Sequence, residues 1–114
     1  MANTGNAQVN IAWDAGSTVK AVTDASLAST LNWFQIGLTV DKTGDKVIAY
    51  INGAQVGSTQ TGLGTWAGAL AATLCNIGAA ATTPTAVWSG LLAHVVIASR
   101  AALAGEMALL ALNP

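Results

Sequence analysis

The chain has 114 residues, of which 53% are hydrophobic and 8% are charged, and its formal net charge is −1 at pH 7. This length suits one domain with one core. The charged fraction is far below the usual value of about 25%, and such a charge-poor surface favours association with other protein surfaces. The four Lys and Arg residues are scattered, which argues against binding to nucleic acid or to an anionic membrane, and no apolar run reaches the roughly 18 residues that span a bilayer.

The N-terminal part is predicted to be an arm followed by two short strands. Residues 1–6 are interpreted as a flexible or docking arm, and we expect no secretory signal because basic and apolar signal regions are lacking. Apolar side chains alternate along residues 8–13, and a second strand is predicted over residues 18–22, after a turn.

Residues 31–58 are predicted to form a three-stranded antiparallel meander. Four apolar residues of its first strand occupy every second position, which predicts one buried face, and they are Phe34, Ile36, Leu38 and Val40. A polar loop over residues 42–45 leads to a second alternating strand over residues 46–51. Asn52 and Gly53 favour a type I′ hairpin turn, because that turn needs positive φ at both central residues.

The C-terminal part is predicted to add two strands and a helix. The strand over residues 73–78 contains Cys75, the only cysteine, interpreted as a core residue of a chain made in a reducing cytoplasm. Residues 87–98 are apolar on both faces, so we expect a strand buried on each side by the helix, another sheet or a neighbouring subunit. Residues 103–112 have the apolar spacing of a short helix. The fold class is therefore all-β: one domain over residues 1–114, an antiparallel jelly-roll-type β-sandwich of about seven strands with a short C-terminal helix.

Several short motifs follow one another in order along the last three quarters of the chain: Trp33, the strand 36–41, the strand 47–50, Asn52-Gly53, Val56-Gly57, Asn76-Ile77-Gly78, Trp88-Ser89-Gly90 and the segment 99–106. Together they resemble LamG-like jelly-roll domains of the concanavalin A-like lectin/glucanase superfamily. The resemblance implies the sandwich fold, and it leaves function open, because this fold serves lectins, glycosidases, adhesion modules and virion proteins. Ala104 stands where the family usually has a Ser or Thr helix N-cap, a loss of about 1 kcal/mol.

The acidic residues do not form the patterns that catalysis or metal binding requires. The glucanases of the superfamily carry a cluster of acids along one strand, and this chain has none, so we expect no enzyme activity. Asp41 and Asp45 share one hairpin, where turn chemistry is favoured over a calcium site. No catalytic residue, metal or cofactor is therefore predicted.

Three residues are candidates for ligand or interface contacts. Trp66 is predicted to lie in a loop, as an exposed contact or as a lid over the sandwich edge. His94 and Val96 belong to the apolar strand, where the family commonly has an acidic pair near His94, and a core or interface role is expected for this histidine. The tryptophans at family aromatic positions, Trp33 and Trp88, are interpreted as structural.

The leading hypothesis is a non-enzymatic structural module that self-associates through an apolar, charge-poor surface, as a homo-oligomer or within a larger protein assembly. Its resemblance to small LamG-like proteins without disulfides suggests a bacteriophage virion component, such as a capsid decoration or tail-associated protein assembled in the host cytoplasm. The alternative is a carbohydrate-binding, lectin-like adhesion module. A surface of small residues that has no partner also fits the composition.

Overall fold

The computed structural model describes residues 9–15, 18–24, 33–65, 77–78, 87 and 91–112. Within these ranges there are five strands and one helix: β1 (Val9–Ala15), β2 (Thr18–Asp24), β3 (Ile36–Asp41), β4 (Lys46–Ile51), β5 (Ala54–Thr61) and α1 (Ala104–Leu112). The strands pair into two antiparallel sheets, the β1–β2 hairpin and the sheet β3–β4–β5. The predicted hairpin and meander are confirmed, and the described strands are fewer than the seven expected.

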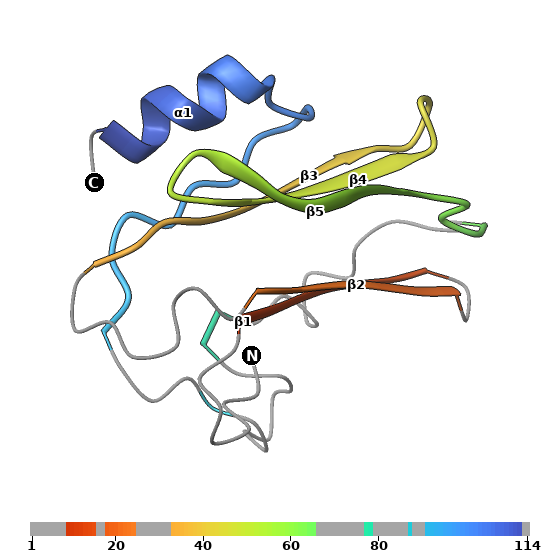
Figure 1. Cartoon of the computed structure of the whole chain (residues 1–114), viewed down its shortest axis with the longest axis horizontal. Coiled ribbons are helices and arrows are strands. Elements are labelled where there is room, and N and C mark those ends of the chain that lie inside the picture. Colours follow the sequence, from red (N-terminus) through yellow and green to blue (C-terminus); the bar gives the residue numbers. More distant parts are fainter. Residues whose placement is uncertain are drawn as a thin grey trace.

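The two sheets lie one above the other, and α1 covers the opposite side of the larger sheet (Figure 1). Strand β2 contacts β5, and a Cβ atom added to Gly57 would come within 2.7 Å of Val22 Cγ1, which shows how closely the hairpin approaches the sheet. On the helix side, a Cβ atom added to Gly53 would come within 2.7 Å of Ala108 Cα. The layer order is thus hairpin, sheet and helix, and the two stacked sheets form a small β-sandwich.

The turns of the meander follow from its local sequence. Asn52 and Gly53 have φ values of 48° and 76°, as the predicted type I′ turn requires. Asp45 also has positive φ, at 49°, and its carboxylate accepts hydrogen bonds from the backbone N–H groups of Gly62 and Leu63, each at 2.9 Å. The β3–β4 turn is therefore tied to the segment that follows β5.

The core has two sides, because both faces of β4 are covered. Tyr50 pairs with Gly37 of β3, and a Cβ atom at Gly37 would collide with the side chain of Met107, so Met107 fills the space that Gly37 leaves open. Val47, Ala49 and Ile51 alternate with Tyr50, lie on the face toward the hairpin and are buried. The central strand of the sheet thus holds the two layers together.

The predicted buried face of β3 is wrong in part. Leu38, expected in the core, is 40% exposed, whereas Thr39 on the other face is 7% exposed. The physical reason is that α1 packs on the face of β3 that carries Gly37 and Thr39. Alternation along the strand shows that two faces exist, and the placement of the helix decides how deeply each is buried.

The predicted strand over residues 87–98 is wrong over residues 91–98, whereas Val87 takes part in an isolated β-bridge. Residues 91–98 have no regular secondary structure and are exposed. The apolar pattern favoured a strand, and a strand forms only where a neighbouring strand offers hydrogen bonds, which the described part of the chain does not supply to this segment. Residues 1–6, most of residues 73–78 and Cys75 lie outside the described residues.

The C-terminal helix begins one residue later than predicted, and its cap differs from the expected one. Leu103 is the N-cap, because its carbonyl accepts the hydrogen bond of Met107 N–H at 3.0 Å. Glu106 is the third helical residue, and its Oε2 accepts the N–H of Leu103 at 2.7 Å. This is one half of a capping box, so a carboxylate satisfies an N-terminal donor although no Ser or Thr precedes the helix.

Candidate functional site

A groove with a volume of about 990 Å³ runs along β3, between the strand, the segment 93–102 and α1. One wall is residues 33–40, which comprise β3 and the residues just before it. The opposite wall includes His94 and Val96, and Met107 and Leu110 contribute from the helix. The groove therefore brings together segments that are about 60 residues apart in the sequence.

One part of the groove wall combines an aromatic ring with polar groups. Trp33 precedes β3 and is 63% exposed, although it was expected to be structural. Gln35 and Asn52 also line the groove. They bond to each other through Asn52 N–H to the Gln35 carbonyl at 3.0 Å and Gln35 N–H to Asn52 Oδ1 at 2.9 Å. The Gln35 side-chain Oε1 is buried and has no hydrogen-bond partner.

The segment 91–98 presents apolar side chains to solvent. Leu91 and Ile97 are each 79% exposed, and the other large apolar residues of the segment, Leu92, Val95 and Val96, are at least half exposed. His94 has a φ of 53°, a left-handed conformation that His adopts more often than most residues and that breaks the extended path of the chain. The segment therefore has the composition of a buried strand without being one.

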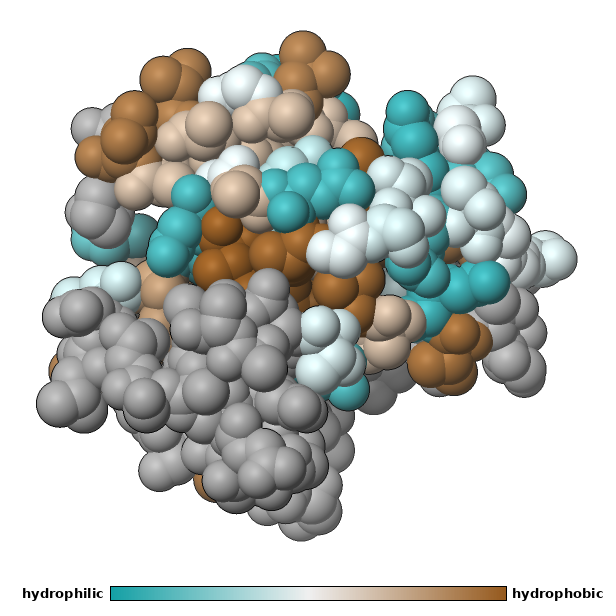
Figure 2. Space-filling model, viewed as in Figure 1, coloured by the Kyte–Doolittle hydropathy of each residue, from teal (hydrophilic) through white to brown (hydrophobic). Residues whose placement is uncertain are grey.

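The outer face of α1 extends this apolar surface. Only Met107 of the helix is buried, and Figure 2 shows hydrophobic side chains gathered over α1. Four helix-region leucines are exposed, and they are Leu103, Leu109, Leu110 and Leu112. A second cavity, of about 700 Å³, lies between this helix and residues 97–102. Large contiguous apolar patches are rare on the surfaces of monomeric proteins.

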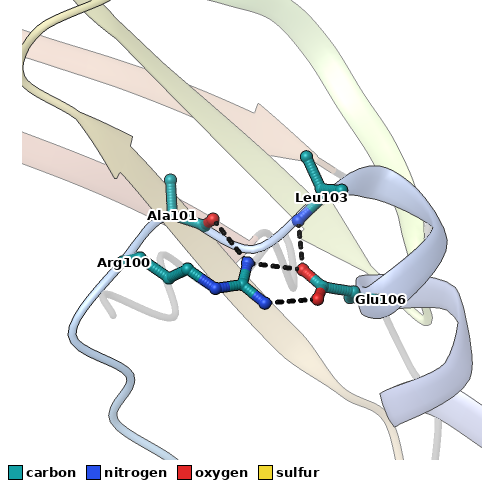
Figure 3. Close-up of polar contacts among 4 residues, drawn as sticks. All are labelled: Arg100, Ala101, Leu103 and Glu106. Carbon is teal, nitrogen blue, oxygen red and sulfur yellow. Dashed lines mark hydrogen bonds and ion pairs between the residues drawn. The ribbon is translucent and has the colours of Figure 1, made fainter.

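The charged groups near the groove are engaged with one another. The Arg100 guanidinium forms a bidentate pair with the Glu106 carboxylate, Nη1 to Oε2 at 2.8 Å and Nη2 to Oε1 at 2.5 Å (Figure 3). These hydrogen bonds, together with the bond from Leu103 N–H, lower the pKa of Glu106 from 4.5 to about 2. The same pair raises the pKa of Arg100. The pair joins the end of the exposed segment to the first turn of α1.

The carboxylates of Asp41 and Asp45 are engaged in turns. Asp41 accepts the N–H of Gly44 at 2.8 Å, and its Oδ2 lies 3.7 Å from Lys46 Nζ. The backbone donors of Leu63 and Gly62 lower the pKa of Asp45. Among the described residues, no acidic side chain lines the groove, and no group of three His, Cys, Asp or Glu side chains is placed to hold a metal ion.

Within the described ranges, no helix is long and apolar enough to cross a membrane.

Comparison with known protein families connects this fold to a superfamily. A family model described as the concanavalin A-like lectin/glucanases superfamily matches residues 1–108, nearly the whole chain. The chain belongs to this superfamily. The two stacked antiparallel sheets agree with the sandwich of concanavalin A-like domains, and the predicted all-β class is confirmed. Searches of curated proteins and of solved structures gave no match.

The structure of this concanavalin A-like domain brings two of the three candidate residues together. His94 and Val96 line the same groove, and both are exposed. Of the two roles expected for His94, the core position is therefore wrong, and the interface role stays a prediction. Trp66 lies outside the described residues. Trp33 was missed as a groove residue. The available signal was its place in the alternation, since Trp33 shares a period of two with the polar Gln35 and Thr39 rather than with the apolar residues.

Proposed function

We propose that this concanavalin A-like domain is a non-enzymatic structural module that self-associates through its apolar surface. One observation carries the proposal: the segment 91–97 and the outer face of α1 expose a set of leucine, valine and isoleucine side chains beside an apolar groove. Burying such a surface stabilises an assembly by about 25 cal/mol for each Å² of apolar area removed from water.

A second copy of the chain is the partner that the charges favour. The net charge is −1, so two copies repel each other very little, and the ion pair of Arg100 with Glu106 leaves the charge near the groove compensated. Symmetric association of identical chains is also the commonest form of oligomer among soluble proteins. The assembly is therefore a homo-oligomer or a larger particle built from it.

Self-association is tested by sedimentation velocity over a wide range of protein concentration. The chain is expected to form a discrete oligomer, and Ile97→Asp is expected to shift the equilibrium to the monomer, because it places a charge in the exposed apolar segment. Ser58→Asp is the matched control, since it adds the same charge to an exposed polar residue of β5. A clean monomer at the highest concentration refutes the proposal.

The assembly is proposed to be a virion component, a capsid decoration or a tail-associated protein assembled in a host cytoplasm. A single cysteine, which excludes a disulfide within the chain, and a charge-poor composition support this placement. Catalysis is not part of the proposal, because Asp41, Asp45 and Glu106 are each engaged in local hydrogen bonds. Electron microscopy of source particles labelled with an antibody against the chain tests the location, and unlabelled particles contradict it.

Carbohydrate binding is the second candidate function, and Trp33 favours it. The exposed indole of Trp33 offers a surface on which a sugar ring stacks, and the amide groups of Gln35 and Asn52 in the same groove offer hydrogen bonds to sugar hydroxyl groups. A glycan array followed by titration of tryptophan fluorescence tests this function. Binding that is lost in Trp33→Ala and kept in Trp33→Phe supports it, whereas an array without hits removes it.

A further inference from the structure

Among the described strands, only β4 pairs with β3, so one edge of β3 has no described strand beside it. Strand β3 lies at the end of the sheet order β3–β4–β5. Gln35 directs its backbone groups toward the β4 side, where it bonds to Asn52. Backbone groups alternate in direction along a strand, so Gly37 and Thr39 also bond toward β4. It follows that three residues direct their N–H and C=O groups to the open side: Ile36, Leu38 and Val40.

The open edge lies beside the groove, and β3 up to Val40 carries none of the sequence features that usually protect an edge strand. The residues of β3 before Asp41 include no Pro and no charged side chain, and the irregular register in this sheet lies between β4 and β5 instead. Helix α1 covers a face of the strand through Met107 and leaves the edge open to the groove. Natural edge strands are normally short, charged, bulged or covered, so an open, uncharged edge is a ready site for a further strand.

The chemistry of the groove specifies what this strand must be. Three backbone donors and three acceptors along residues 36–40 require an extended segment of at least five residues, which is about 17 Å long. The apolar walls and the compensated charge of Arg100 exclude a charged segment. Among the described residues, the exposed segment of this kind is residues 91–98, which contain no Asp, Glu, Lys or Arg and include three β-branched side chains, Val95, Val96 and Ile97.

We propose that residues 91–98 of a second copy add to the open edge of β3 as an extra strand. This inference rests on the proposed self-association and names its contact surface. The added strand satisfies the outward backbone groups of Ile36, Leu38 and Val40 and buries the exposed side chains of residues 91–97 in the groove. His94 leaves its left-handed conformation when the segment becomes extended, so the segment is a strand only in the assembly.

Hydrogen exchange read residue by residue tests the pairing. The amides of Ile36, Leu38 and Val40 are expected to exchange at least about ten times more slowly in the oligomer than in the diluted monomer. The amides of Gly37 and Thr39 serve as internal controls, because they already bond to β4 and change less. If the amides of Ile36, Leu38 and Val40 exchange slowly in the monomer, a segment of the same chain already pairs with this edge. If they exchange fast in the oligomer, no strand pairs with the edge. Either result overturns the proposal.

A pair of matched substitutions tests the edge itself. Leu38→Lys places a charge on the open edge at a residue that is already 40% exposed, so the monomer is expected to fold, and its association constant is expected to fall at least about ten-fold. Thr61→Lys adds the same charge at an exposed residue of β5, the other edge strand of this sheet, and is expected to change association less than about two-fold. Equal effects of the two substitutions overturn strand addition at β3.

Cross-linking identifies the segment that adds. In a Cys75→Ala background, chains carrying only Leu38→Cys are mixed with chains carrying only Val96→Cys and treated with a short bismaleimide. Linked mixed dimers are expected, and Thr61→Cys in place of Leu38→Cys is expected to give none. An oligomer that forms without the Leu38–Val96 link refutes this strand addition and leaves self-association standing. A chain that stays monomeric refutes both proposals.

Discussion

The contact between the β4–β5 turn and α1 gives the sharpest test of the packing. Gly53→Ala places a methyl group 2.7 Å from Ala108 Cα and 3.1 Å from the Met107 carbonyl oxygen, distances that require the helix backbone to move. The φ of 76° adds a cost of about 1–2 kcal/mol for a residue with a side chain. Displacing a packed element adds about 1–3 kcal/mol, so the free energy of unfolding is expected to fall by about 2–5 kcal/mol.

The conformational part of this cost is isolated by Gly62→Ala. Gly62 has a similar φ of 67°, and the nearest atom to an added methyl group is Lys20 Nζ at 3.8 Å, so only the cost of about 1–2 kcal/mol applies. Urea denaturation of both variants, followed by circular dichroism, measures the difference. At about 4 °C for each kcal/mol, Gly53→Ala should also melt several degrees below Gly62→Ala. Equal destabilisation of the two variants would refute the packing of α1 on this turn.

Three further predictions concern the helix and the turns. Glu106→Gln removes the bidentate partner of Arg100 and lowers the melting temperature at pH 7. Because the folded-state pKa of Glu106 is lowered to about 2, the difference from the unsubstituted chain should be full above about pH 4.5 and vanish as the pH falls through 2; a difference that is constant with pH contradicts it. Gly105→Ala adds a methyl group in open space and should stabilise the helix by up to about 1 kcal/mol in urea denaturation; a loss of stability contradicts the described helix. Asp45→Asn leaves one of two backbone donors unpaired and should lower the melting temperature, most strongly above about pH 4, whereas an unchanged melting temperature shows that this tie is dispensable.

The strands of the meander and the C-terminal helix could be predicted from the short-range pattern of residues within each of them. The meander was predictable because period-two alternation, a polar hairpin loop and Asn52-Gly53 all act over a few residues, and the positive φ values of this turn agree with that prediction. The helix was predictable to within one residue from its apolar spacing. Its cap was not, because Glu106 reaches back to Leu103 through a side-chain hydrogen bond that depends on where the helix starts.

The candidate site was predictable only in part. His94 and Val96 were chosen because they lie in an apolar segment, and they do line the groove. Trp33 was missed because its family position suggested a structural role, and its exposure depends on which residues cover it. Residues 91–98 were wrongly predicted for the same reason. Their composition indicates that the side chains favour burial, but it does not indicate whether the residues that bury them belong to the same chain or to another.

Residue pattern and composition were enough to predict an all-β member of this superfamily with a central meander, a terminal helix and a surface poor in charge. These properties depend on backbone preferences and on the balance of residue types, which act locally or over the whole chain. The packing of distant segments determines that Met107 of α1 covers Gly37, that β3 ends the order of the described strands, and that residues 91–98 lie exposed beside a groove. The reason is that burial is a relation between distant segments, and no single strand or helix specifies what packs against it.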